Sequence, residues 1–234
     1  MKTALQNLLL VFIIMLSFCK TFSQSKTDGV QIADYKPEAA KSGKDGDHRW
    51  VLIKLFRMAN SGKDGSDGKA GASVRINIAA IPAEGNNVVL QIVSTTNTKS
   101  SKDTFFVDPQ KGQIKFIADG GNGGSGGAGG TGLSKDGKKS ATSGGSGGDG
   151  GKGGKGGNIE VYFDSTAFAF INCPCLIYSN EGGRGGYKGQ GGAAAADYTY
   201  EPGKGTDGKN GAAGDRGLPV YIRKVGSDKI FLMK

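Results

Sequence analysis

Two glycine tracts set the pattern of this sequence: residues 120–132 read GGNGGSGGAGGTG, and residues 144–157 read GGSGGDGGKGGKGG. Glycine fills two of every three positions in both tracts. A third tract, residues 182–192, reads GGRGGYKGQGG and departs from the rule only at Lys188. Because glycine has no Cβ, a strict period of three favours an extended helix with three residues per turn, which neighbouring chains approach closely.

A second kind of tract has glycine at every third position only. It covers residues 62–71 and 205–217, and Gly43 and Gly46 begin another such run. These Gly-x-x tracts are collagen-like in pattern, but a collagen triple helix needs long runs and much proline. The two longer runs have only four or five triplets, and proline only flanks the second of them, so a triple helix is excluded.

The sequence around the tracts distinguishes a flexible linker from a packed array. Gly/Ser-rich sequence forms a flexible coil by default. However, an apolar residue continues a glycine row at four tract ends, namely at Ile117, Val74, Ile159 and Val220. A linker has no reason to keep this phase, whereas a continuous extended chain buries one face throughout.

The number of glycine rows predicts the position of each tract. A face that touches a neighbouring chain has no room for Cβ, so one glycine row means one close contact and two rows mean two. We therefore expect Gly-Gly-x tracts inside a packed layer and Gly-x-x tracts at its edge. Residues 133–143 (LSKDGKKSATS) are expected to turn between two antiparallel glycine helices.

Strand signals lie between the tracts, and no segment has helical periodicity. A Gly-Ser-Asp hairpin signal separates the last two stretches. The expected strand regions are residues 50–56, 74–78, 88–93, 104–107, 113–117, 159–163, 167–171, 176–178, 220–225 and 229–233. The predicted fold class is mostly β, with extended glycine-rich (polyglycine II) helices packed side by side in a bundle and no significant α-helix apart from a signal peptide.

The glycine tracts resemble those of the polyglycine II bundle proteins, which include glycine-rich phage tail-fibre adhesins and Gly-x-x antifreeze proteins of arthropods. The resemblance covers roughly a quarter of the chain. It implies a rigid repeat scaffold whose binding target depends on loops that differ between proteins. The antifreeze proteins are nearly all repeat, whereas this chain carries much strand sequence.

The N-terminus indicates export. Lys2 precedes an apolar run, residues 8–18, which is too short for the ~20 residues of a membrane-spanning helix and has the length of a signal-peptide core. We expect cleavage after Ser23, and lipidation of Cys19 is the alternative. The predicted organisation is a signal peptide (1–23), a polar lead (24–40) and one glycine-repeat/β domain (41–234). No later segment is apolar enough for a membrane-spanning helix.

The mature chain is basic. Cleavage after Ser23 removes Lys2 and Lys20, which lowers the formal charge from +9 to +7. Outside the cytoplasm, such a protein meets acidic glycans and envelope phosphates. Aspartates are mixed with lysines along the repeats, which weakens any patch of one sign. Lysines that only keep the surface soluble are the other interpretation.

Little in the sequence points to chemistry. The single histidine, His48, and the absence of a Gly-x-Ser-x-Gly elbow argue against hydrolase triads. We expect no catalytic residue, metal or cofactor. Cys173 and Cys175 form Cys-Pro-Cys and are predicted to be a disulfide or structural thiols, since export permits a disulfide. A redox motif is expected to read Cys-x-x-Cys at a helix start.

The candidate binding surface consists of residues between the glycines. In one tract Arg184, Tyr187 and Gln190 form the non-glycine row, which places a cation and an aromatic ring about 9 Å apart. Lys188 breaks the glycine rows beside them. Lys152 and Lys155 form a similar basic row, and Trp50 is either a carbohydrate-stacking platform or a core residue.

Together these features predict an exported, non-catalytic structural or adhesive module at the cell surface, in the outer envelope or outside the cell, with the periplasm as an alternative location. Such a module fits a subunit of a cell-envelope assembly with a protein or glycan partner. The alternative is a protein that binds an acidic polymer, a glycan or nucleic acid, through its lysine-bearing rows. Nucleic acid is the less expected of these partners in an exported protein.

Overall fold

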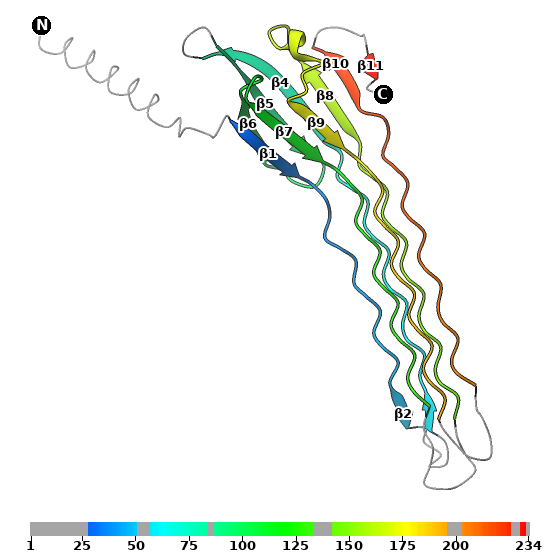
Figure 1. Cartoon of the computed structure of the whole chain (residues 1–234). Coiled ribbons are helices and arrows are strands. Elements are labelled where there is room, and N and C mark those ends of the chain that lie inside the picture. The colour runs from blue at the N-terminus through cyan, green and yellow to red at the C-terminus, as the bar shows by residue number, and fades with distance from the viewer. Residues whose placement is uncertain are drawn as a thin grey trace, which may run out of the picture.

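The computed structural model describes residues 28–50, 57–83, 87–132, 142–195, 203–225 and 230–232. In this part the chain is mostly β-sheet, and its one helix is a short 3-10 turn, η2 (Phe168–Phe170). Two sheets form a head, from which extended glycine-rich segments project side by side (Figure 1). The expectation of a mostly β fold without significant α-helix in the mature chain is confirmed for these residues.

One sheet of the head has three parallel strands, in the order β1 (Gly29–Asp34), β7 (Gly112–Ile117) and β9 (Leu176–Ser179). Each strand is a different part of the chain, so the sheet forms only when distant segments meet. All three strands run toward the glycine-rich segments (Figure 1).

The second sheet has six strands in the order β11-β10-β8-β4-β5-β6. Strands β10 (Tyr221–Lys224), β8 (Ile159–Phe163) and β4 (Val74–Pro82) are parallel to one another. Strands β5 (Val88–Thr96), β6 (Lys102–Val107) and β11 (Ile230–Leu232) pair antiparallel with their neighbours. A separate pair, β2 (His48–Trp50) and β3 (Arg57–Ala59), lies at the far end of the glycine segments (Figure 1).

The hydrophobic core lies in the head. In a strand, alternate side chains point to one face, and most inward residues of both sheets are apolar, with Ser94 among the exceptions. Phe116 and Phe163 are fully buried, together with isoleucines of β4, β5 and β7. Val74 and Ile159, which continue glycine rows into strands, belong to this core, and Val220 packs against it.

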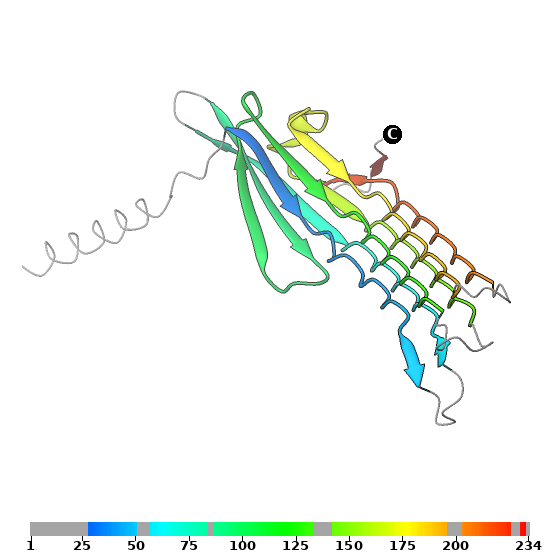
Figure 2. The ribbon, with the colours of Figure 1, turned by 60° about the horizontal axis from the view of Figure 1, so that its bottom comes forward.

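Six glycine segments connect the sheets to the far end of the molecule. Segments I, III and V leave the three-stranded sheet, and segments II, IV and VI return to the six-stranded sheet. They comprise residues 35–47 (I), 60–73 (II), 118–132 (III), 142–158 (IV), 180–195 (V) and 203–220 (VI). The two sheets therefore continue as two layers, which we call the outgoing and the returning layer of the glycine array (Figure 2).

Backbone hydrogen bonds join the segments in both directions. Within each layer the neighbours are parallel: for example, Gly126 N donates to Tyr187 O at 2.8 Å between segments III and V. Between layers the neighbours are antiparallel: Gly148 N donates to Gly127 O at 2.9 Å, and Gly151 N to Gly124 O at 2.8 Å. The buried backbone groups of the array thus have hydrogen-bond partners, although the segments do not form a conventional sheet.

The glycines are required by the closeness of these contacts. A Cβ on Gly151 would lie 2.0 Å from Ser66 O, and one on Gly124 would lie 2.0 Å from Lys41 O. Both obstacles are backbone atoms, which cannot swing away as a side chain would. Segments III and IV, which are Gly-Gly-x tracts, lie in the middle of their layers, as expected. Segment V is also Gly-Gly-x but lies at the edge of its layer.

The strand register continues into the array without a break. In the sheet Asp34 pairs with Ile117, and in the array Ala128 N donates to Asp45 Oδ1, a separation of 83 residues in both cases. On the other layer Val74 pairs with Ile159 and Asp149 N donates to Asp64 Oδ1, both 85 residues apart. Each strand and its glycine segment therefore form one continuous extended element.

Two expectations from the sequence need correction. Residues 29–34, expected in a polar lead, form β1 and pair with β7. The strand signal is weak because its apolar Val30 and Ile32 face outward while Gln31 points inward, where its Nε2 donates to Phe106 O at 2.8 Å. Residues 167–171, expected as a strand, contain η2, whose turn is stabilised by the Phe170 N to Ala167 O hydrogen bond.

The other strand expectations agree with the structure to within a few residues at each end. The expected strand at residues 50–56 lies mostly outside the described residues, as do the signal peptide and nearly all of the turn at residues 133–143. In the described part of the chain, no helix has the length and apolarity needed to cross a membrane.

Candidate binding surface

The outgoing layer presents the row of Arg184, Tyr187 and Gln190. Their carbonyl oxygens accept hydrogen bonds from Gly123, Gly126 and Gly129, each at 2.8 Å. These bonds fix the backbone of segment V and leave all three side chains exposed. Tyr187 is the most exposed large apolar side chain of the described residues, at 76%. The expected row of a cation, an aromatic ring and an amide is present.

Lys188 does not join this row. Its Nζ lies 3.0 Å from Asp207 Oδ2 on segment VI, and its backbone N donates to Asn210 Oδ1 at 2.9 Å. The Gly191 N–H, the Lys188 ammonium and then Lys204 favour the ionised carboxylate, so the pKa of Asp207 is lowered below its usual range. Lys188 interrupts the row of Gly182, Gly185 and Gly191, whose Cβ positions lie 1.9 to 2.0 Å from backbone oxygens of segment VI, yet its own side chain is exposed.

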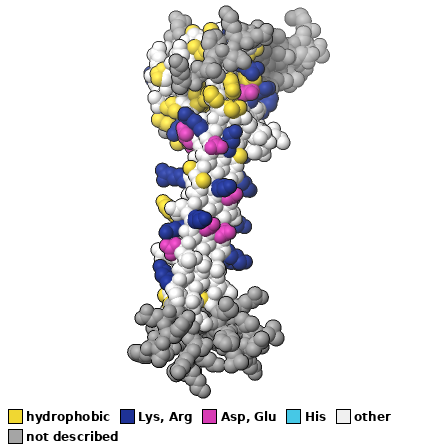
Figure 3. All heavy atoms as spheres, turned by 90° about the vertical axis from the view of Figure 1, so that its right-hand side faces the viewer, with side chains coloured by type: hydrophobic (Ala, Val, Ile, Leu, Met, Phe, Trp, Pro, Cys, Tyr) yellow, Lys and Arg dark blue, Asp and Glu magenta, His cyan; other side chains and the backbone are white. Residues whose placement is uncertain are grey.

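Lys152 and Lys155 are exposed on the returning layer, as expected. They lie among carboxylates, since Lys152 N donates to Asp67 Oδ1 at 2.7 Å and Asp149 precedes Lys152 by one triplet. Figure 3 shows basic and acidic side chains alternating along the visible face of the array. This face is a mixed one rather than a field of one sign.

A denser group of lysines lies at the edge formed by segments I and II. Lys63 N donates to Lys44 O at 2.8 Å, and Ser66 N donates to Lys41 O at 2.9 Å, so the three lysines are neighbours. Their side chains are exposed, and none forms an ion pair with another described residue. We call Lys41, Lys44 and Lys63 the basic edge.

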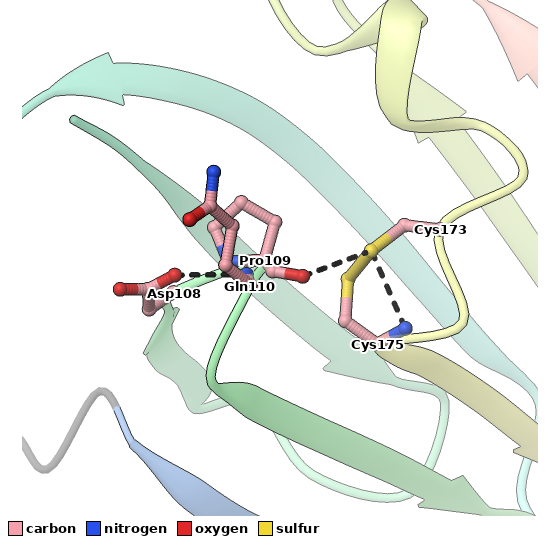
Figure 4. Close-up of a disulfide and its surroundings, with 5 residues drawn as sticks. All are labelled: Asp108, Pro109, Gln110, Cys173 and Cys175. Atoms are coloured by element: carbon pink, nitrogen blue, oxygen red, sulfur yellow. Dashed lines mark hydrogen bonds between the residues drawn. A yellow bond between two sulfur atoms is a disulfide. The ribbon is translucent and has the colours of Figure 1, made fainter.

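Trp50 and the cysteines lie at opposite ends of the molecule. The backbone of Trp50 ends β2 at the far end of the array, and the position of its side chain lies outside the description. Cys173 and Cys175 lie in the head and form a disulfide (Figure 4). The sequence left open whether they are a disulfide or free thiols.

The sequence interpretation missed an ordering device that recurs along the array. At six places in the described part of the chain where Asp or Asn directly precedes glycine, the Asp or Asn side-chain oxygen accepts from the N–H of one residue on the neighbouring segment, and the glycine N–H donates to the C=O of that same residue. We call this arrangement the Asx-Gly clamp. It occurs at Asp45, Asp64, Asp67, Asp119, Asn122 and Asp149.

The clamp satisfies the backbone N–H groups that face outward between the glycine rows. Asp67 and Gly68 hold both main-chain groups of Lys152, at 2.7 Å each. Asn122 and Gly123 hold Arg184 in the same way, at 3.0 and 2.8 Å. The repeated Asx-Gly dipeptides were the available signal, but their meaning depends on which segments are neighbours.

The described residues contain no group of three or more His, Cys, Asp or Glu side chains that could hold a metal ion. Comparison with protein-family models, curated proteins and solved structures gives no match for this chain. The resemblance to polyglycine II proteins therefore depends on the glycine pattern alone.

Proposed function

We propose that the six glycine segments are polyglycine II helices packed as a bundle, and that the protein is an exported, non-catalytic structural or adhesive module. The period of three, the hydrogen bonds that run between segments, and the lack of space for a Cβ at most glycines of the array support this assignment. Isolated helices of this type have no internal hydrogen bonds, so the packing itself supplies them.

The observation that carries the proposal is the exposed row of Arg184, Tyr187 and Gln190 on a backbone fixed by regular hydrogen bonds. Polyglycine II geometry spaces these side chains about 9 Å apart along a straight line. A flat row of this kind suits contact with an extended partner, such as a glycan or another envelope protein. Catalysis instead requires side chains that converge on one point.

Export is supported by the N-terminal pattern of Lys2 and the apolar run at residues 8–18. The Cys173–Cys175 disulfide fits an oxidising compartment. The same proposal includes a location at the cell surface or in the outer envelope. The N-terminus is then either cleaved or carries a lipid on Cys19.

A second candidate function is binding of an acidic polymer, and the basic edge favours it. Lys41, Lys44 and Lys63 are adjacent, exposed and without ion pairs to described residues. Carboxylates also lie beside these lysines, because Asp45 and Asp64 directly follow Lys44 and Lys63, as Asp149 lies beside Lys152. Binding through lysines is strongly weakened by salt.

The first experiment locates the protein in its own cells by fractionation and by external protease treatment of intact cells. We expect it in the outer envelope or the medium; recovery in the cytoplasm alone refutes the proposal.

The second experiment measures retention of the purified protein on isolated envelopes. The Arg184→Ala/Tyr187→Ala variant is expected to lower retention at least about tenfold, because aromatic and arginine anchors dominate interfaces. Lys152→Ala/Lys155→Ala on the opposite layer is the matched control. Loss of retention only in Lys41→Ala/Lys44→Ala/Lys63→Ala, together with suppression by salt, instead supports the acidic-polymer function.

A further inference from the structure

The Cys173–Cys175 disulfide is not explained by the structural role of the array. It closes a loop with a single residue between the cysteines, and the entropy that a disulfide removes from the unfolded chain grows with loop length. The stabilising effect of such a short ring is therefore small. Its position and surroundings point to another use.

The two cysteines differ in accessibility. Cys175 is 2% exposed and directly precedes β9, where its carbonyl oxygen accepts from Ile114 N at 2.8 Å. Cys173 is half-buried and lies on the loop after η2. An incoming group therefore meets the Cys173 sulfur first, while Cys175 is held by the sheet.

Cys173 lines a cavity of about 380 Å³ at the end of the head. Val88, Pro109 and Phe170 give the cavity apolar walls, and Asp108 supplies a carboxylate. Figure 4 shows residues 108–110 across from the disulfide, with Pro109 toward Cys173. The cavity is large enough for one or two amino-acid side chains beside the reactive sulfur.

Two backbone groups lie beside Cys173 Sγ in position to form hydrogen bonds with its reduced forms. Cys175 N–H points at Cys173 Sγ from 3.3 Å, in position to stabilise a thiolate. Pro109 O lies 3.7 Å from the same sulfur, in position to accept from a thiol (Figure 4). Opening the ring therefore leaves the Cys173 sulfur with a hydrogen-bond partner in either protonation state.

We propose that Cys173–Cys175 is a thiol–disulfide exchange site whose co-reactant is an external thiol, with the cavity beside Cys173 receiving the residues that flank it. The external thiolate attacks Cys173 Sγ, which forms a mixed disulfide, and the Cys173–Cys175 bond breaks with Cys175 leaving as a thiolate. Attack by Cys175 on Cys173 reverses this step.

A second external thiolate that attacks the external sulfur of the mixed disulfide completes the exchange. It forms an external disulfide and leaves Cys173 and Cys175 reduced, so two electrons pass from two thiols to the pair. Apolar walls and Asp108 favour a thiol flanked by apolar and basic residues, as in a polypeptide cysteine, over an anionic small thiol.

The test uses the full chain carrying Cys19→Ser, so that the only cysteines are those of the pair. The oxidised protein is treated with either glutathione or a short peptide containing cysteine between lysine and leucine. The reaction is quenched with acid and a maleimide, and adducts are located by peptide mass mapping. We expect the mixed disulfide on Cys173 and the maleimide on Cys175, with the peptide reacting at least about tenfold faster than glutathione.

Single variants provide the matched comparison. With Cys175→Ser, the free Cys173 is expected to form a stable mixed disulfide with the oxidised peptide. With Cys173→Ser, the buried Cys175 is expected to react at least about tenfold more slowly. Far-UV circular dichroism of each variant checks that the head remains folded.

Three outcomes overturn the proposal: a disulfide that stays intact under both thiols while the protein is folded, adducts mainly on Cys175, or reduction accompanied by unfolding. Equal rates with glutathione and the peptide would show that the cavity does not select the residues that flank the thiol, which refutes that part of the proposal. None of these results depends on where the protein binds or is located.

Discussion

Gly151 shows at the scale of a single residue why glycine cannot be replaced inside the array. The ideal Cβ position of Gly151 lies 2.0 Å from Ser66 O and 2.5 Å from Ser66 C. Relief of these contacts requires segments II and IV to separate, which breaks hydrogen bonds on both sides. Gly203 lies at the start of segment VI, and among the described residues no atom beyond its chain neighbours lies within 4 Å of its Cβ position.

We therefore predict that Gly151→Ala lowers the free energy of unfolding by about 3 kcal/mol or more, because the clash involves backbone atoms. The control, Gly203→Ala, is expected to change it by less than about 1 kcal/mol, in the stabilising direction, through the unfolded chain. Chemical denaturation measures both. Equal effects of the two substitutions contradict close packing at Gly151.

The Asx-Gly clamp leads to a second prediction at this scale. Asp67→Ala removes the acceptor of Lys152 N and is expected to cost about 1 kcal/mol of unfolding free energy. Asp67→Asn retains an acceptor oxygen, as Asn122 does in its own clamp, and is expected to lie within about 0.5 kcal/mol of the wild type.

The control for the clamp is Asp215→Ala, because Asp215 contributes its main-chain carbonyl to the array. It is expected to be close to neutral in the same denaturation assay. If Asp67→Asn is as unstable as Asp67→Ala, charge rather than the hydrogen bond explains the role of Asp67.

Tyr178 provides a third test, because its buried hydroxyl has no hydrogen-bond partner among the described residues. Burial raises the pKa of this phenol, and its ring stacks on Phe116 with centroids 6.0 Å apart. Tyr178→Phe keeps the ring and removes the unsatisfied group, so we predict a gain of about 1 kcal/mol in unfolding free energy.

Tyr35→Phe is the matched comparison. The Tyr35 hydroxyl lies 2.6 Å from Ser94 Oγ and donates to Asp103 Oδ2 at 3.2 Å. Its removal leaves Ser94 without that partner, and a loss of about 1 kcal/mol is expected. A loss of unfolding free energy in Tyr178→Phe, as in Tyr35→Phe, would contradict the assignment of the Tyr178 hydroxyl as unsatisfied.

At the scale of the element, each glycine segment depends on its neighbours for every regular hydrogen bond. Segments III and IV have neighbours in their own layer and in the other layer, through amides such as Gly124 N and Gly151 N. Each of these groups is satisfied only while the neighbouring segment stays in place.

We predict that amides of residues 120–132 and 144–157 exchange hydrogen slowly, with protection close to that of the central strands β4 and β8. An amide that is hydrogen-bonded inside a packed structure exchanges only when that part of the structure opens, so its exchange is slow. Peptide-resolved hydrogen exchange on the folded protein measures this. Exchange at the rate of an unstructured chain would mean that the tracts are linkers and that the bundle proposal is wrong.

At the scale of the whole molecule, the head and the array form one continuous structure. The three-stranded sheet continues as the outgoing layer and the six-stranded sheet as the returning layer, with the register of β1 and β7 and of β4 and β8 kept throughout. Separation of the layers in the array therefore pulls on the same pairs of strands that enclose the core.

We predict that Gly151→Ala lowers the thermal midpoint of the head and of the array by the same amount. A loss of about 3 kcal/mol corresponds to roughly 6–12 °C for a chain of this size. Temperature-dependent hydrogen exchange, resolved by peptide, reports on the head through β4 and β8 and on the array through residues 144–157. A head midpoint that stays unchanged would show two independent units.

The sequence by itself determined the local conformation. The period of three indicated extended segments, the alternation in residues 74–78 and 159–163 indicated strands, and the phase of Val74 and Ile159 indicated that the buried face continues from tract to strand. The exposed row of Arg184, Tyr187 and Gln190 followed from the same period. These features depend on the steric properties of neighbouring residues, which sequence records directly.

The tertiary structure alone decided which segments are neighbours. Pairing over 83 or 85 residues, the Asx-Gly clamps, the basic edge and the removal of Lys188 from the exposed row all depend on contacts between distant parts of the chain. β1 escaped detection because its apolar side chains face outward and its pairing partner lies in β7. Local sequence carries no record of such partners, because glycine-rich segments look alike until packing assigns each one its place.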